Sequence, residues 1–335
     1  MKKLIAGLLS AAFVFVAIPH QSFAQEAEEI KDPSMAPYQH RLVQETIVAL
    51  RYNPLGLAVK SKAEYQYRLY ESSEKAFEQN FVAPGVFMDV TPANIKIGPT
   101  LAIQPLSVLQ VSAGYYLLNY FGSFDRVQSF TTLDADYSDD AIKENAGLEP
   151  PANYSASGSV LQLGGKFQIK AGPVAVRSTN RAMKFSLATK ENPATGEKDP
   201  LFYESELDLM VPANGWAYQV DNDVLYFTDF GLMAGLRHTY ATAFYSDDID
   251  AGTGPATTGV NHRIGPFLAY RFHTDPIEKR SFYNEPTLVL LVNWYLNHTY
   301  RTGDDADGAR EHTGSQAMPY IALAYRFTGD ILDID

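Results

Sequence analysis

The stretch "GLAVKSKAEYQYRLY", residues 56–70, alternates apolar and polar side chains along almost its whole length. The apolar residues fall on odd positions: Leu57, Val59, Ala63, Tyr65, Tyr67 and Leu69. The polar residues fall on even positions: Lys60, Lys62, Glu64, Gln66 and Arg68. Successive side chains of a strand point to opposite faces, so a period of two predicts a long β-strand with one apolar and one charged face. The architecture then depends on what covers each face.

The first residues have the pattern of a secretory signal peptide. Lys2 and Lys3 precede an apolar run over 4–18, and "HQSFA" ends at Ala24. A membrane anchor helix is the alternative, but the run is shorter than the roughly 20 residues that cross a bilayer. We therefore predict an exported chain with a signal peptide over 1–24, cleaved after Ala24.

Composition narrows the class of protein. The chain has no Cys, so neither a disulfide nor thiol chemistry is available, and it carries 21 Tyr and 19 Phe. Such a composition fits a globular all-β protein or a membrane barrel, whose strands are half apolar. The net charge of −12 becomes more negative once the signal peptide is removed, which argues against nucleic acid as a partner. No cofactor is predicted.

The alternating pattern recurs and predicts about ten antiparallel strands of a transmembrane β-barrel. These are 54–72, 94–105, 109–117, 156–170, 173–188, 201–211, 229–245, 260–273, 285–301 and 316–327. The segment 212–228 also resembles strand sequence, and counting it as two short strands gives twelve as the alternative.

The connections are of two lengths, short at 105–107 and 171–173 and long at 122–155, 246–259 and 302–314. Outer-membrane barrels have short periplasmic turns and long extracellular loops. We therefore expect 54–72 to run outward and 316–327 to run inward, with both termini periplasmic. The predicted domains after the signal peptide are a periplasmic N-terminal segment (25–53), the barrel (54–327) and a short C-terminal tail (328–335).

Strand length and aromatic placement favour a membrane barrel over a soluble sandwich. Sandwich strands usually have about 5–6 residues, whereas a tilted strand needs about 9–11 to cross a bilayer. Aromatic residues near strand ends suit interfacial girdles: Tyr70, Tyr115, Phe121, Trp216, Trp294, Tyr300, Tyr325 and Phe327.

The last predicted strand, "MPYIALAYRF" (318–327), resembles the final strand of Gram-negative outer-membrane β-barrel proteins, and "RYNPLGL" (51–57) resembles a motif that leads into several such barrels. Here the aromatic Phe327 is followed by "TGDILDID", whereas the family's assembly signal ends on the aromatic itself. The resemblance implies an outer-membrane location, with lipid, lipopolysaccharide and the barrel assembly machinery as partners.

If the apolar parity faces lipid, charges of both signs point into the barrel. The predicted lumen charge network consists of Lys60, Lys62, Glu64, Arg68, Glu204, Glu206, Asp208, Arg237, Arg263, Arg271 and Arg326. Small barrels are largely filled by their side chains, and buried charges there must be paired. The lumen is then either a salt-bridged plug or a narrow charge-lined pore. The choice depends on whether the acidic residues of 201–211 contact the arginines directly or leave a gap.

The sequence shows no phosphate-binding loop, HExxH or GxSxG motif, so no catalytic residue and no metal ligand is assigned. Parity places His238 and His298 near the outer rim among lipid-facing residues, without an evident orienting partner. Acidic clusters occur at 134–140, 247–250 and 304–307, where divalent cations are a hypothesis. "DDADG" at 304–308 is similar to a calcium loop, but Gly303 and Gly314 occupy ligand positions, so the full spacing fails.

The predicted function is a porin-like outer-membrane barrel with either a structural, surface-presentation role or a narrow pore. A hydrolase that acts on lipid or peptide at the rim is the alternative from another class. A soluble periplasmic β-protein is the third.

Overall fold

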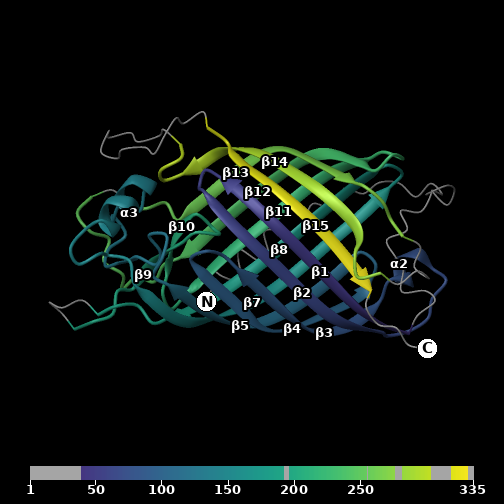
Figure 1. The fold of residues 1–335 in the computed structure, drawn as a ribbon, viewed down its shortest axis with the longest axis horizontal. Coiled ribbons are helices and arrows are strands. Elements are labelled where there is room, and N and C mark those ends of the chain that lie inside the picture. The colour runs from purple at the N-terminus through teal and green to yellow at the C-terminus, as the bar shows by residue number, and fades with distance from the viewer. Residues whose placement is uncertain (1–38, 192–195, 255, 276–280, 303–317, 331–335) are drawn as a thin grey trace. The chain divides into compact units, whose positions relative to one another are not determined.

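A computed structural model describes residues 39–191, 196–254, 256–275, 281–302 and 318–330 of the chain. In these residues twelve strands form one closed antiparallel barrel (Figure 1). They are β1 (His40–Tyr52), β2 (Gly56–Arg68), β3 (Phe81–Val90), β4 (Asn94–Leu106), β5 (Leu109–Phe121), β7 (Ser155–Ala171), β8 (Val174–Leu187), β11 (Trp216–Phe227), β12 (Leu232–Phe244), β13 (Val260–Arg271), β14 (Asn284–His298) and β15 (Tyr320–Asp330).

The predicted all-β antiparallel barrel is confirmed, and each strand pairs with the next barrel strand along the chain. The first and last strands close the ring, with Val43 of β1 opposite Asp330 of β15 and Tyr52 opposite Ile321. Closure pairs every strand on both sides and so leaves no free sheet edge.

The main count of about ten strands is wrong, and twelve is correct. Two barrel strands, β1 and β3, were not predicted, and 212–228 contains one full barrel strand, β11, instead of two short ones. Pro84 and Gly85 interrupt β3, which makes its sequence similar to a turn, yet Pro84 lies within the ladder opposite Leu101. Conversely, 201–211 is not a barrel strand.

The extra first strand also changes the strand directions. The barrel begins at His40 and not at residue 54, because β1 lies within the range predicted as an N-terminal segment. Since β1 is antiparallel to both β2 and β15, these two strands run in the same direction. The expectation that 54–72 and 316–327 run oppositely is therefore wrong. The predicted signal peptide and residues 331–335 of the tail lie outside the described residues.

The outer face of the barrel is apolar. On β2, Leu57, Val59, Tyr65 and Tyr67 are exposed, and exposed aliphatic or aromatic side chains also occur on β4, β5, β7, β8, β12 and β13. No helix within the described residues is long and apolar enough to span a membrane. Exposed apolar area of this extent indicates a non-aqueous surrounding or a partner surface.

The two ends of the barrel differ. One end, called here the long-connection end, carries the connections 122–154, 188–215 and 245–259, with helix α3 (Asp139–Ala146) and a small sheet of β6 (Ser129–Phe130), β9 (Leu201–Glu204) and β10 (Leu209–Pro212). The opposite, short-connection end carries the turns after β4 and β7 and the short helix α2 (Lys75–Glu78) (Figure 1). The first barrel strand starts, and the last one ends, at the short-connection end.

Candidate functional site

The connection between β8 and β11 folds back as a hairpin, residues 201–212, called here the plug hairpin. Its strands β9 and β10 pair with each other, and all eight of their residues are buried. Phe202, Leu209 and Val211 pack in one apolar cluster with inward side chains of β5, β7, β8, β11 and β12, among them Tyr120 and Phe185. The apolar residues of the hairpin therefore pack against one side of the barrel interior, and Arg51 of β1 and Lys60 of β2 reach its tip from the other side.

The tip of the plug hairpin is held by a charge cluster. Glu206 accepts hydrogen bonds from Lys60 Nζ at 2.7 Å, Lys96 Nζ at 2.6 Å and Arg181 Nη1 at 3.1 Å, from strands β2, β4 and β8. Asp89 of β3 lies 3.3 Å from Lys60 Nζ and 3.4 Å from Lys96 Nζ. Glu206 thus links the plug hairpin to three separate barrel strands.

The two neighbouring glutamates of the tip differ in acidity. Burial alone would raise the pKa of Glu206, but Lys60, Lys96 and Arg181 outweigh it and hold that pKa well below 4.5. Burial raises the pKa of Glu204, and the nearby Glu206 charge raises it further. Glu204 Oε2 accepts the Leu207 N–H at 2.7 Å, which fixes the tip. One carboxylate is therefore firmly ionised, whereas the other retains its proton more readily.

A second charge cluster joins the plug hairpin to helix α3. Asp208, only 1% exposed, accepts hydrogen bonds from Tyr203 Oη at 2.7 Å and Arg301 Nε at 3.1 Å. Arg301 also donates to Asp139 Oδ2 at 2.7 Å, at the start of α3. Burial would raise the pKa of Asp208, but Arg301 outweighs it and keeps that pKa far below its usual range. Arg301 therefore fixes the hairpin and the helix to each other.

The two rim histidines lie in different environments. His298 is buried, so its predicted lipid-facing position is wrong. Its Nδ1 accepts the Tyr300 N–H at 3.0 Å, and its Nε2 lies 2.6 Å from the Asp208 carbonyl oxygen. With both ring nitrogens engaged by the backbone, His298 cannot act as a general base in this arrangement. His238 lies on the outer face, its Nε2 2.8 Å from that of His262.

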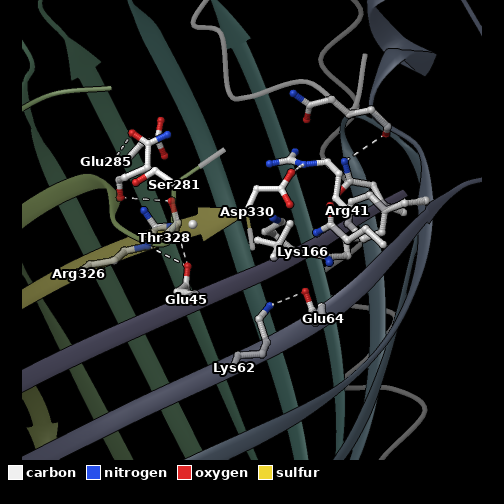
Figure 2. Close-up of a pocket in the computed structure, with 18 of the residues that line it drawn as sticks. Arg41, Glu45, Lys62, Glu64, Lys166, Ser281, Glu285, Arg326, Thr328 and Asp330 are labelled. Carbon is white, nitrogen blue, oxygen red and sulfur yellow. Dashed lines mark hydrogen bonds and ion pairs between the residues drawn. The ribbon is translucent and has the colours of Figure 1, made fainter. Parts of the chain in front are cut away.

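Most other predicted lumen charges form ion pairs, either within one strand or between neighbouring strands. Lys62 Nζ lies 3.0 Å from Glu64 Oε2, and Arg326 Nε donates to Glu45 at 2.8 Å. Figure 2 shows these two pairs around a cavity at the short-connection end, together with the buried pair of Arg41 and Asp330 at 2.9 Å. Further along the wall, Arg237 Nε donates to Asp223 Oδ1 at 2.6 Å, and Arg271 Nη1 lies 3.3 Å from Glu285 Oε1.

Two of the predicted lumen arginines are not in ion pairs within the described residues. Arg68 makes no side-chain ion pair, and its Nε is buried without a hydrogen-bond partner. Arg263 lies 4.0 Å above the centroid of the Tyr320 ring, and its Nε is likewise buried without a partner. These arginines differ from Arg237, which is fully paired with Asp223.

Three cavities follow one another along the barrel interior. An outer chamber of 690 Å³ at the long-connection end shares Lys60, Lys96, Arg181 and Glu206 with a middle chamber of 330 Å³. The middle chamber shares residues with an inner chamber of 200 Å³, the cavity of Figure 2, among them Lys62 and Glu64. The charge cluster of the hairpin tip therefore forms the boundary between the outer and middle chambers.

The outer chamber is more basic than the rest of the molecule. Its charged lining residues are eight basic and six acidic, namely Arg51, Lys60, Lys96, Arg126, Lys143, Arg181, Arg237 and Arg263 against Asp89, Asp125, Asp139, Glu204, Glu206 and Asp221. The whole chain has a net charge of −12. A low-dielectric wall focuses such a local excess, so the outer chamber favours anions although the protein is acidic.

The sequence did not single out several of these residues. Lys96 falls on the polar parity of its strand, and alternation could have found it. Asp89 and Arg51 belong to the unpredicted strands β3 and β1, and Arg301 follows a strand end without periodicity. No local pattern could have placed Arg301 beside Asp208, because 93 residues separate them.

The acidic connections make structural contacts. Asp134 accepts the N–H groups of Thr253 and Gly254, both at 2.8 Å, and so joins two long connections. The Thr132 hydroxyl, followed by the Gly254 N–H, lowers the pKa of Asp134. Within the described ranges, no three or more His, Cys, Asp or Glu side chains are grouped to hold a metal ion. The acidic cluster at 304–307 lies outside those ranges, and divalent cations at the connections stay a prediction.

Comparison with known proteins gives matches among solved structures alone. No protein-family model matches the chain, and no curated protein sequence does. A NanC porin aligns at a TM-score of 0.37 and 10% identity over 86% of this chain and 100% of that one. OccAB1 of Acinetobacter baumannii aligns at a TM-score of 0.36 and 12% identity, over 82% of this chain and 58% of that one. OmpT, an outer membrane protein of Vibrio cholerae, aligns at a TM-score of 0.33 and 8% identity, over 86% of this chain and 98% of that one. These values assign neither a function nor a ligand.

Proposed function

We propose that the chain is an outer-membrane barrel that passes small hydrophilic solutes through a narrow, charge-lined lumen. The apolar outer face, the closed ring of twelve strands and the signal-peptide pattern together support insertion in an outer membrane. The plug hairpin narrows the lumen without filling it.

The succession of the three chambers carries this proposal. Each shares lining residues with the next, so cavities with charged lining residues extend from the long-connection end to the short-connection end. Each is far larger than the roughly 30 Å³ that one water occupies in the liquid. A lumen sealed by packed side chains would instead leave isolated voids.

The proposed selectivity element is the boundary cluster of Glu206, Lys60, Lys96 and Arg181, which lines both the outer and the middle chamber. Its three cations share Glu206, and two of them also contact Asp89, which leaves a constriction with charges of both signs. A solute that crosses it exchanges its hydration for hydrogen bonds to these fixed side chains. We therefore expect small solutes to pass and large ones to be excluded by size.

A structural surface-presentation role is the second candidate. The contact of Arg301 with both Asp208 and Asp139 organises the plug hairpin and α3 into one assembly at the long-connection end. A barrel that serves to display this assembly needs no open lumen. The two roles therefore differ in solute flux.

Liposome swelling tests the proposal. Refolded residues 25–335 in vesicles are expected to admit a pentose and to exclude a tetrasaccharide, since the constriction limits size. Swelling equal to that of protein-free vesicles, with strand circular dichroism showing a folded barrel, would favour surface presentation instead. A rim hydrolase would release product from lipid or peptide and lose that activity in His238→Ala, and a soluble periplasmic protein would not enter vesicles.

A further inference from the structure

Part of the lining of the outer chamber is the barrel wall formed by β13, β14, β15, β1 and β2. Small side chains line it on three successive strands of the ring, Ala322 on β15, Ala49 on β1 and Ala58 on β2. Beside them, Arg263 of β13, Asn293 of β14 and Tyr320 of β15 face the same chamber. The three polar side chains form a compact group on adjacent strands.

Arg263 is built into this wall and lacks a carboxylate. It is 7% exposed, its guanidinium lies over the Tyr320 ring at 4.0 Å, and its buried Nε has no hydrogen-bond partner. Within the described part of the chain, Arg263 makes no ion pair and no side-chain hydrogen bond. A buried donor without a partner is unfavourable, so the site favours a ligand that accepts a hydrogen bond from it.

Asn293 has two further unpartnered atoms. It is 1% exposed, and neither Nδ2 nor Oδ1 makes a hydrogen bond within the described residues. Asn293 pairs across the ladder with Tyr320. On β13, Gly265 has no side chain there, and a Cβ would lie 2.0 Å from the Val292 carbonyl oxygen and 2.7 Å from Asn293 Cα. The close approach of the two backbones therefore requires glycine and keeps a side chain away from Asn293.

We propose that Arg263 and Asn293 form a binding site for a small hydroxycarboxylate in the outer chamber. The inference deepens the proposed passage of small solutes and rests on it for its physiological meaning. The unpartnered atoms are two donors, Arg263 Nε and Asn293 Nδ2, and one acceptor, Asn293 Oδ1. Two donors suit the oxygens of a carboxylate, and the acceptor suits a neighbouring hydroxyl.

The basic excess of the chamber supports the same ligand class. Arg51, on strand β1, donates at 3.4 Å to the backbone oxygen of Glu206 and forms no ion pair with any described residue. Two arginines that lack a carboxylate partner among the described residues therefore face one chamber. An entering carboxylate would supply the missing negative charge, which a neutral sugar would not.

Calorimetry on refolded residues 25–335 in detergent micelles tests the site with malate and succinate, which differ by one hydroxyl. We expect malate to bind at least about fivefold more tightly, because only malate can donate to Asn293 Oδ1. Arg263→Gln is expected to weaken malate at least about tenfold. Asn293→Leu is expected to bring the malate-to-succinate ratio close to one. Lys143→Gln removes a charge from the same chamber at an exposed position and is expected to change binding less than about twofold.

Strand circular dichroism establishes folding of every variant before titration. Absence of malate binding by the folded wild type would overturn the site, as would equal affinities in wild type and Arg263→Gln. Equal loss in Lys143→Gln would overturn it too, since a diffuse charge effect would then suffice. Conduction is measured separately. Malate binding without solute flux refutes the proposed passage and supports the site. Solute flux without malate binding refutes the site and supports the passage.

Discussion

The Glu206 carboxylate lies 2.6 Å from the Lys96 ammonium although 110 residues separate them in the sequence. The contact joins the tip of the plug hairpin to barrel strand β4. Lys60 and Arg181 meet the same carboxylate from β2 and β8, so one side chain joins the hairpin tip to three barrel strands. The boundary between the outer and middle chambers is formed at this point.

Replacing Glu206 by Gln should loosen the plug hairpin. Three cations would lose their shared carboxylate, and the loss of one partner of a buried pair is strongly destabilising. Because the Glu206 side chain is 24% exposed, we expect a reduced cost of about 1–3 kcal/mol in unfolding free energy. Single-channel recordings should show larger and noisier openings. The exposed Glu144→Gln on α3 is the control, and identical recordings in all three proteins would contradict the role of the tip.

Acid should weaken the plug through Glu206 and Asp208. The pKa of each is lower in the folded protein than its usual 4.5 and 3.8, so their stabilisation is present above those values. It is lost progressively as the pH falls through the folded pKa values. Wild type should therefore lose thermal stability more steeply than the double variant Glu206→Gln, Asp208→Asn over this acidic range. Parallel curves would show that these carboxylates do not account for the acid response.

Arg301→Lys should separate α3 from the plug hairpin. Arg301 contacts Asp208 and Asp139 through several guanidinium nitrogens, and a lysine cannot reproduce this geometry. Loss of a buried partner of Asp208 is expected to cost about 3 kcal/mol in unfolding free energy. Limited proteolysis should then cut within 122–154 at lower protease concentration than in wild type. Unchanged cleavage would mean that the apolar packing alone holds this assembly.

The membrane orientation predicts a depth-dependent cost for charges on the outer face. Leu163 lies at the middle of β7 and is exposed, whereas Ser157 lies near the strand end on the same face. In lipid vesicles, Leu163→Arg should cost about 2–4 kcal/mol in folding free energy, and Ser157→Arg at most about 1 kcal/mol. Urea titrations of refolding measure both. Equal costs at the two positions would contradict a bilayer around the barrel.

The barrel itself could be predicted from alternation, because each strand has one apolar and one polar face. Strands β1 and β3 were not predicted, because 40–52 contains consecutive apolar residues and β3 contains Pro84 and Gly85. The run 201–211 alternates as well, but it reverses at 205–208 and is buried on both sides. Periodicity reports which residues share a face, and it does not report whether the strand belongs to the wall or to the interior.

The charged residues could be predicted to occur inside, but not which of them meet. Lys62 and Glu64 lie on one strand, and their contact at 3.0 Å is a local one. The contacts of Glu206 and Asp208 depend on a connection folding back into the barrel, which no local sequence pattern encodes. The unpartnered state of Arg263 likewise results from packing across β13, β14 and β15.

Single-channel conductance of refolded residues 25–335 in a planar bilayer tests the continuous polar lumen most directly. We predict steady openings of small conductance with a preference for anions, because the outer chamber carries more basic than acidic side chains. Inserted protein without openings would contradict the passage and show that the boundary cluster around Glu206 seals the lumen. A preference for cations would contradict the assignment of the outer chamber as the selective region.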